Sequence, residues 1–416
     1  MFEQQLKYDL FRAYYSARQN KRNTWNQLRF EIDQESELLT LADEILERRY
    51  DLRPSIAFIV DDPVKREIFA ADFRDRVIHH LLFNYINPIL DAQFVTDSYS
   101  CRVGKGTLYG IERAEMFVRE CSENYTKDCW VLKLDITGYF MAMNKHLLWD
   151  KLAKMLQNSD FALPPSTRVE GLVPPQEELN KLVWYLLDKV IWNDPRKNCI
   201  VKGKRSNWDG LPPSKSLFHA AQDCGLPIGN LTSQLFSNVY LHDFDSYVQN
   251  DLGVKYYGRY VDDFILIHPE KSFLLDALAK IRCYLAEHSG LVLHPNKIYL
   301  QHYSKGFAFL GSYIKPHRRY IAHRTKKKFL QAVANSNKVL GKKNPNREEL
   351  EKVRATLNSY LGIMIHSKTY NIRKKVLLGK SHEFFKYGHL SGLKKYCLKK
   401  SVTQPLVRGS DRIELE

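Results

Sequence analysis

Two adjacent carboxylates, Asp262 and Asp263, interrupt an otherwise apolar stretch, GRYVDDFILIH. The aromatic and branched residues on both sides predict two buried strands of a hairpin, with the acid pair at its turn. This turn lacks the Asn-Gly or Asp-Gly sequence that tight hairpins prefer, and adjacent carboxylates repel each other. A solvated turn is the simplest interpretation, because Asp favours turns. A divalent cation is the alternative, because Mg²⁺ prefers oxygen ligands and its charge holds two carboxylates together.

A third carboxylate, Asp135, ends a predicted strand from Trp130 to Ile136. Alone, Asp135 would be interpreted as a turn residue at a strand end. Two acid-bearing strand ends that meet in one sheet, however, form a cage for two divalent ions. Such ions activate an attacking oxygen and stabilise the leaving one in nucleotidyl transfer.

The composition indicates a large globular protein that binds a polyanion. The chain has 416 residues, of which 44% are hydrophobic, so it can build one large core or two to three subdomains. Lys and Arg number 63 against 47 acidic residues, which gives a formal charge of +16. The seven cysteines are scattered without a CxxC pair, and no uncharged apolar run reaches membrane-spanning length. We therefore expect a cytoplasmic protein without disulfides, zinc or a membrane segment.

The elements that must position the acids follow from periodicity and turn signals. We expect helices up to about residue 55, then two strands joined at Asp62-Pro63 and a helix. Further helices are predicted from Lys145, within LNKLVWYLLDKVIW, after GLPIGN, and before Gly290. A mobile basic loop is predicted in DPRKNCIVKGKRSNWDGLPPSK, and basic helices are predicted after about residue 323. The fold class is α+β.

Five segments carry a resemblance to reverse transcriptases. KLDITGYF, GLPIGNLTSQLFSNVYL, YGRYVDDFILI, LVLHPNKIYL and KGFAFLGSYI occur in the order and spacing of the palm motifs A to E, and the resemblance spans about residues 50 to 370. It implies a right-hand polymerase with fingers, a palm with an antiparallel sheet, and a helical thumb. The implied boundaries are 1–125 for N-terminal helices and fingers, 126–320 for the palm with a fingers or loop segment at about 158–225, 321–395 for the thumb and 396–416 for a tail.

Within that family, the chain resembles the reverse transcriptases of diversity-generating retroelements. Most reverse transcriptases have Gln where this chain has Ile228, and the pattern I-G-x-x-x-S-Q ends at Gln234. One departure is Ala142, where relatives usually have Ser. The resemblance implies copying of a template-repeat RNA into cDNA with errors at template adenines, and a pentameric accessory variability determinant as partner. The alternatives are a retron or phage-defence reverse transcriptase and a non-catalytic RNA-binding scaffold; an RNA-dependent RNA polymerase conflicts with Phe140.

The resemblance also implies roles for individual residues. Asp135 and Asp262 would hold two Mg²⁺ ions, for which Mn²⁺ can substitute, with the Ile136 carbonyl assisting and Asp263 supporting the site. Phe140 matches the aromatic gate that excludes a 2′-OH. Lys297 would protonate or neutralise the leaving pyrophosphate.

Other implied contacts are to dNTPs, template RNA and the cDNA/RNA duplex. The simpler interpretation of Ile228 is that it is a core residue. The simpler interpretation of Lys326, Lys327 and Lys328 is that they lie on a solvated face. The implied residues are Arg66 and Arg76 for phosphates; Ile228, Gly229 and Gln234 for the base or template; Phe309, Leu310 and Gly311 for the primer grip; and Lys326, Lys327 and Lys328 for the nucleic-acid backbone.

Overall fold

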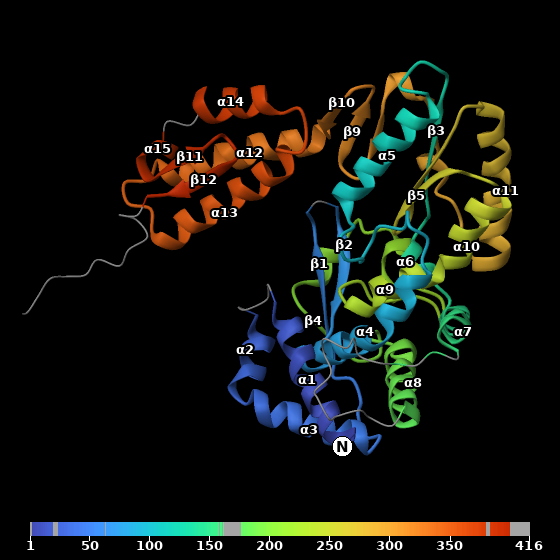
Figure 1. Ribbon diagram of the computed structural model, residues 1–416. Coiled ribbons are helices and arrows are strands. Elements are labelled where there is room, and N and C mark those ends of the chain that lie inside the picture. Colours follow the sequence, from blue (N-terminus) through green and yellow to red (C-terminus); the bar gives the residue numbers. More distant parts are fainter. Residues whose placement is uncertain are drawn as a thin grey trace, which may run out of the picture. The chain divides into compact units, whose positions relative to one another are not determined.

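The computed structural model describes residues 2–19, 24–62, 64–157, 159, 161, 176–379 and 383–399 (Figure 1). From residue 400 onward, the predicted tail lies outside the described residues, as does most of 158–175. The chain divides into two compact units, Met1–Leu300 and Gln301–Glu416. The predicted division into fingers, palm and thumb stays a prediction.

The first unit begins with three helices, as the periodicity predicts. They are α1 (Phe2–Arg18), α2 (Trp25–Ile32) and α3 (Gln34–Leu46). α1 and α2 pack on the long helix α4 (Phe73–Gln93), which is capped by the Asp72 side chain. Their buried faces join one large apolar core that also includes the helix α8 (Gln176–Trp192).

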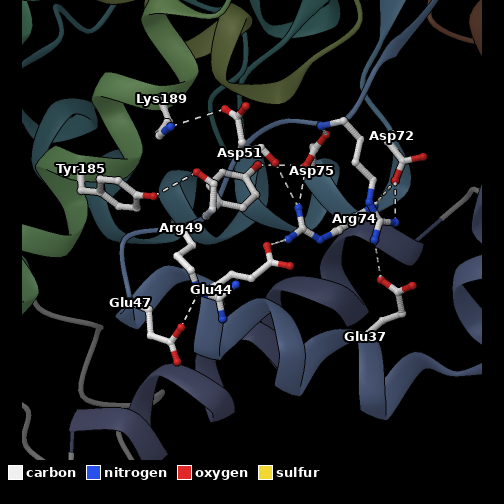
Figure 2. A network of polar contacts seen from close by, with 12 residues as sticks. Glu37, Glu44, Glu47, Arg49, Asp51, Asp72, Arg74, Asp75, Tyr185 and Lys189 are labelled. Carbon is white, nitrogen blue, oxygen red and sulfur yellow. Dashed lines mark hydrogen bonds and ion pairs between the residues drawn. The ribbon is translucent and has the colours of Figure 1, made fainter.

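A polar network fixes the start of α4 against its neighbours (Figure 2). Asp75 is buried and accepts hydrogen bonds from the Tyr50 hydroxyl at 3.0 Å and the Arg53 amide at 2.7 Å. Arg74, also buried, ion-pairs with Glu44 on α3. The start of α4 is therefore tied both to α3 and to the segment that leads into the first sheet.

That first sheet has the strand order β2-β1-β4. β1 (Ser55–Val60) pairs antiparallel with β2 (Arg66–Ala70), which confirms the predicted strand-turn-strand segment, and parallel with β4 (Cys199–Val201). The segment predicted as a mobile basic loop therefore contains a strand. Its fold depends on the buried Glu67 carboxylate, which accepts hydrogen bonds from Trp208 Nε1 at 2.6 Å and Ser216 Oγ at 2.7 Å. The turn signals in this segment did not reveal a partner that lies so far away in sequence.

The second sheet has the strand order β5-β6-β3-β7 and contains the predicted antiparallel hairpin. β5 (Tyr256–Tyr260) and β6 (Asp263–His268) pair antiparallel, and β6 pairs antiparallel with β3 (Trp130–Asp135). β7 is Tyr299–His302. The helices of this part are α5 (Thr107–Cys121), α6 (Tyr139–Ala142), α7 (Lys145–Leu156), α9 (Leu231–Tyr240), α10 (His242–Ser246) and α11 (Lys271–Ser289). Gly290 ends α11 with φ +62°, as predicted.

The second unit has its own core. Its three-stranded sheet consists of β8 (Phe307–Phe309), β9 (Ser312–Lys315) and β10 (Arg318–Ile321), and its helices are α12 (His323–Leu340), α13 (Arg347–Met364), α14 (Tyr370–Gly379) and α15 (Phe384–Tyr387). A hairpin of β11 (Gly388–Ser391) and β12 (Lys395–Leu398) follows. Tyr396 is fully buried there, so ordered structure continues past the predicted start of the tail at residue 396.

The mixture of helices and separate antiparallel sheets confirms the α+β class. Among the described residues, none of the helices combines the length and the apolar character that crossing a bilayer requires.

Candidate active site

Strand pairing brings the three predicted carboxylates to one end of the second sheet. Asp135, the last residue of β3, is directly opposite Asp263, the first residue of β6. Asp263 is in turn opposite Tyr260, the last residue of β5. Val261 and Asp262 therefore form a two-residue hairpin turn, which places Asp262 beside the other two acids.

The hairpin turn is strained at Val261. Its φ is +59°, in the left-handed region, whereas Asp262 does not have a positive φ. A glycine normally occupies the first position, because a β-branched residue with positive φ is a clear outlier. Strain of this kind persists only where the surroundings impose it, and it concentrates at functional sites.

Burial and mutual repulsion disfavour the charged forms of the acid pair. Burial, reinforced by the nearby charge of Asp135, raises the pKa of Asp262, while Lys297 and Arg66 act in the opposite direction. Burial also raises the pKa of Asp263 to about 6, although Lys133 opposes the shift. The site therefore holds more negative charge than its surroundings balance.

Two lysines lie against the outer acids. Lys297 Nζ is 2.7 Å from Asp135 Oδ1 and 2.8 Å from Oδ2. Backbone hydrogen bonds from the Thr137 amide to the Val292 carbonyl and from the His294 amide to the Asp135 carbonyl dock the lysine's segment on the end of β3. Lys133 Nζ lies 3.3 Å from Asp263 Oδ2.

The donor set suits a hard divalent cation. Asp263 Oδ1 is buried and has no hydrogen-bond partner in the described part of the chain, so an acceptor is left for a cation. Ile136, whose carbonyl is a predicted ligand, is buried and pairs with Leu293. Within the described ranges, no three acidic, His or Cys side chains are already arranged as a metal site, and Lys297 takes both oxygens of Asp135.

The predicted gate and the predicted base contact share one apolar cluster. Phe140 on α6 and Ile228 both pack against a buried cluster that includes Phe69 and Met141. The Phe69 amide donates to the Ile228 carbonyl at 2.9 Å. Gly229 has φ +133°, and a Cβ there would lie 3.1 Å from the Phe69 carbonyl oxygen, so glycine is required. Gln234 is exposed on α9.

The two predicted phosphate-binding arginines differ in their surroundings. Arg66 is exposed at the start of β2, near enough to lower the pKa of Asp262. Arg76 is half-buried on α4, and burial lowers its pKa. Within the described residues, its guanidinium has no hydrogen-bond or ion-pair partner. An uncompensated, half-buried arginine is well suited to an anion.

The remaining predicted residues lie in the second unit. Leu310 (φ +46°) and Gly311 (φ +84°) form the turn between β8 and β9, and Phe309 before them is buried. Lys326 and Lys327 are exposed on the first turns of α12, and Lys328 beside them is half-buried.

Sequence reasoning missed three charged residues around the acids. Lys133 lies in β3, Arg259 in β5 and Asp245 in α10. Arg259 and Asp245 are fully buried and ion-paired. Two of these residues could have been found from the sequence, because each is a charged residue within a mostly apolar strand: Lys133 in WVLKLD and Arg259 in YYGRYV.

Part of the chain matches a known protein family. Residues 190–314 match the protein-family model described as reverse transcriptase (RNA-dependent DNA polymerase). This range contains Asp262, Asp263 and Lys297, whereas Asp135 precedes it. Protein YkfC of Escherichia coli K12 is 23% identical over 309 residues, which are 66% of this chain and 70% of YkfC.

Two solved telomerase structures are also similar. Apo telomerase from Candida tropicalis is 12% identical with a TM-score of 0.46, over 81% of this chain and 61% of that chain. Telomerase from Candida albicans in complex with a TWJ fragment of telomeric RNA is 12% identical with a TM-score of 0.44, over 82% and 61%. This chain thus spans less than two thirds of either telomerase chain.

Residues 190–314 therefore match a reverse transcriptase domain, and the described helices and antiparallel sheets are consistent with the right-hand polymerase fold that the resemblance implies. RNA-directed DNA polymerase is the enzyme class to which this domain belongs.

Proposed function

We propose that the protein copies a template-repeat RNA into cDNA for a diversity-generating retroelement, with errors concentrated at template adenines. The observation that carries the polymerase part is the meeting of Asp135, Asp262 and Asp263 at one end of the second sheet. The feature that favours the retroelement subtype is Ile228, at a position where most reverse transcriptases have a polar Gln. Ile228 packs against the same buried cluster as the predicted sugar gate, Phe140.

The three acids serve nucleotidyl transfer in this proposal. Asp135 and Asp262, with the Ile136 carbonyl and support from Asp263, would hold two Mg²⁺ ions, which activate the primer 3′-oxygen and stabilise the leaving oxygen. Lys297 ion-pairs with Asp135 at the edge of this site. Its ammonium group would supply positive charge to neutralise the leaving pyrophosphate.

The surrounding residues would select the substrate. Phe140 offers an aromatic surface with no hydrogen-bond acceptor for a 2′-OH, which favours dNTPs. Ile228 offers no hydrogen bond to the base or template, so discrimination there depends on shape alone. Arg66 and Arg76 would bind the triphosphate. We also propose that the protein binds a pentameric accessory protein through its basic surface and that it acts in the cytoplasm.

The test is deep sequencing of cDNA made by the purified chain from a primed RNA template with Mg²⁺ and all four dNTPs. Asp262→Asn should abolish synthesis and leave RNA binding nearly unchanged. Errors concentrated at template adenines would support the retroelement assignment, and low, even errors would favour the second candidate, a retron or phage-defence reverse transcriptase. Synthesis retained by Asp262→Asn would overturn the site, whereas a wild type inactive even with candidate partners would favour a non-catalytic scaffold.

Ile228→Gln tests the subtype at one residue. Restoring a hydrogen-bonding group should lower the misincorporation frequency opposite adenine by about tenfold, since contacts to polar groups discriminate more strongly than apolar ones. The same sequencing measures it, with Ile228→Leu as the control that keeps an apolar side chain of equal size. An identical spectrum in Ile228→Gln would reduce Ile228 to core packing.

A further inference from the structure

A buried ion pair lies directly behind the turn that carries Asp262. Arg259 Nε donates to Asp245 Oδ1 at 2.7 Å, and Nη2 donates to Oδ2 at 2.5 Å. The exposed fractions of the two side chains are 0% and 1%. The Tyr257 hydroxyl also donates to Asp245 Oδ1, at 2.6 Å, so the carboxylate itself is fixed.

The third guanidinium nitrogen reaches the strained residue. Arg259 Nη1 donates to the Val261 carbonyl at 3.0 Å, while Nη2 donates a further hydrogen bond to Ser98 Oγ at 3.3 Å. That carbonyl belongs to the peptide unit linking Val261, with φ +59°, to Asp262. A hydrogen bond to it fixes the plane of that peptide and thereby the direction in which Asp262 leaves the turn.

The backbone of Arg259 is held as firmly as its side chain. Its amide donates to the Asp97 carbonyl at 2.8 Å, and its carbonyl accepts from the Tyr99 amide at 2.9 Å. Tyr99 also excludes a side chain at position 258, because a Cβ on Gly258 would lie 2.2 Å from the Tyr99 hydroxyl. β5 is therefore clamped by a neighbouring segment at the residue that supports the turn.

Stability alone does not account for such a pair. A buried ion pair gains little over well-packed apolar residues, because both ions must lose their water. A planar fork with donors in fixed directions can, however, bind a carboxylate and a carbonyl at the same time. The arrangement therefore suits a role in orienting neighbouring groups more than a role in stabilising the fold.

We propose that Arg259 and Asp245 are positioning residues, which direct the Asp262 carboxylate toward the cation by holding the Val261 carbonyl. The inference rests on the proposed polymerase function, since it assumes that Asp262 binds the cation. Arg259 contacts the carbonyl, and Asp245 orients Arg259. Neither residue touches the reacting atoms.

The test is Mn²⁺ binding to the full chain, followed by electron paramagnetic resonance, for wild type and Arg259→Lys. Lysine keeps the charge but cannot bind Asp245 and the Val261 carbonyl together, so the dissociation constant for Mn²⁺ should rise about tenfold or more, as for other residues that orient metal ligands. In primer extension, kcat should fall about 100-fold while the KM for dNTP stays within about twofold, because only the alignment of the site changes.

The matched control is Arg74→Lys, which alters an equally buried arginine that ion-pairs with Glu44, remote from the hairpin. Its Mn²⁺ affinity should equal that of wild type. Asp245→Asn, which can still accept the Tyr257 hydrogen bond, is the second variant should Arg259→Lys fail to fold. Unchanged Mn²⁺ affinity in a folded Arg259→Lys or Asp245→Asn protein would overturn the inference.

The two proposals can fail separately. If wild type binds Mn²⁺ through Asp262 but makes no cDNA, the polymerase proposal fails, and the binding comparison still decides the role of Arg259. If wild type makes cDNA and both variants match it in Mn²⁺ affinity and kcat, the positioning role alone is wrong.

Discussion

Two lysines and three carboxylates set the charge balance of the site. Lys297 and Lys133 each lie against one outer acid, whereas Asp262 forms no ion pair within the described residues. Burial, together with the charge of the neighbouring acids, raises the pKa values of Asp262 and Asp263, and the two lysines oppose this shift only in part. A divalent cation supplies the missing positive charge, so metal affinity should increase as these acids lose their protons.

The acids were easier to predict than their neighbours. Asp135 and the Asp262-Asp263 pair end or begin strands with strong apolar patterns, so their meeting follows from antiparallel pairing. Arg259 and Asp245 could not be paired from sequence, because Asp245 lies on a separate short helix and nothing local fixes its direction. The positive φ of Val261 could not be predicted either, because β-branched residues prefer negative φ values.

Phe140→Ala tests the sugar gate. Removing the ring opens space for a 2′-OH, so the preference for dNTP over rNTP, measured as a ratio of kcat/KM values, should fall by about tenfold or more. Single-nucleotide primer extension with matched dNTP and rNTP gives the ratio.

Phe218→Ala is the control for the lost aromatic packing. Phe218 is 39% exposed, and its ring lies tilted against that of Phe69 with the centroids 5.2 Å apart. Phe140 packs against the cluster that contains Phe69. Its removal should disturb the cluster without changing sugar preference. Equal effects of the two substitutions would mean that general loosening, and not a gate, sets the preference.

At the scale of elements, the network at the start of α4 gives the protein a defined pH response. Burial raises the pKa of Asp75 to about 7. The folded state therefore keeps a proton that the unfolded state, in which the Asp pKa has its ordinary value of 3.8, has already lost. Since the folded state binds more protons between these two values, the contribution of Asp75 to the free energy of unfolding falls as pH rises from about 4 to about 7.

Asp75→Asn should remove this response. Between pH 5 and pH 8, the melting temperature of the variant, measured without added metal, should change by several degrees less than that of wild type. Each 1 kcal/mol of unfolding free energy shifts the melting temperature of a chain this size by about 2–4 °C or less. Differential scanning calorimetry measures it. Asp188→Asn, on the exposed side of α8, is the control and should keep the wild-type response. A wild-type response in Asp75→Asn would place the sensitivity in other acids.

Elements with a strong apolar period were predicted well, and those that depend on distant partners were not. α7, α8 and α11 begin and end close to the predicted residues because their own periodicity defines them. β4 was missed because its hydrogen bonds come from β1, far back in the sequence, and because Glu67 organises the loop around it. The β11–β12 hairpin was missed for a similar reason: Tyr396 is ordered by Asn358 and the Phe384 carbonyl.

At the scale of the whole molecule, the formal charge of +16 indicates a polyanion partner without locating it. Several lysines already form ion pairs with nearby acids. Lys127, Lys181 and Lys280 each lie within 2.8 Å of an acid four residues earlier. The lysines at the start of α12, Lys326, Lys327 and Lys328, form three consecutive positive charges. Local concentration of charge, more than its total, should therefore decide where a nucleic-acid backbone binds.

Replacing Lys326, Lys327 and Lys328 by Gln tests this idea. If each contacts one phosphate, the slope of log K against log salt for a primed RNA template should become shallower by about 2–3, since each neutralised phosphate contributes about 0.7–0.9. Fluorescence anisotropy across a NaCl series gives the slope. Substituting Gln for Lys127, Lys181 and Lys280 lowers the net charge by the same three units at three separate places in the sequence. That control should keep the wild-type slope, and equal slopes for the two triple variants would assign binding to net charge and not to α12.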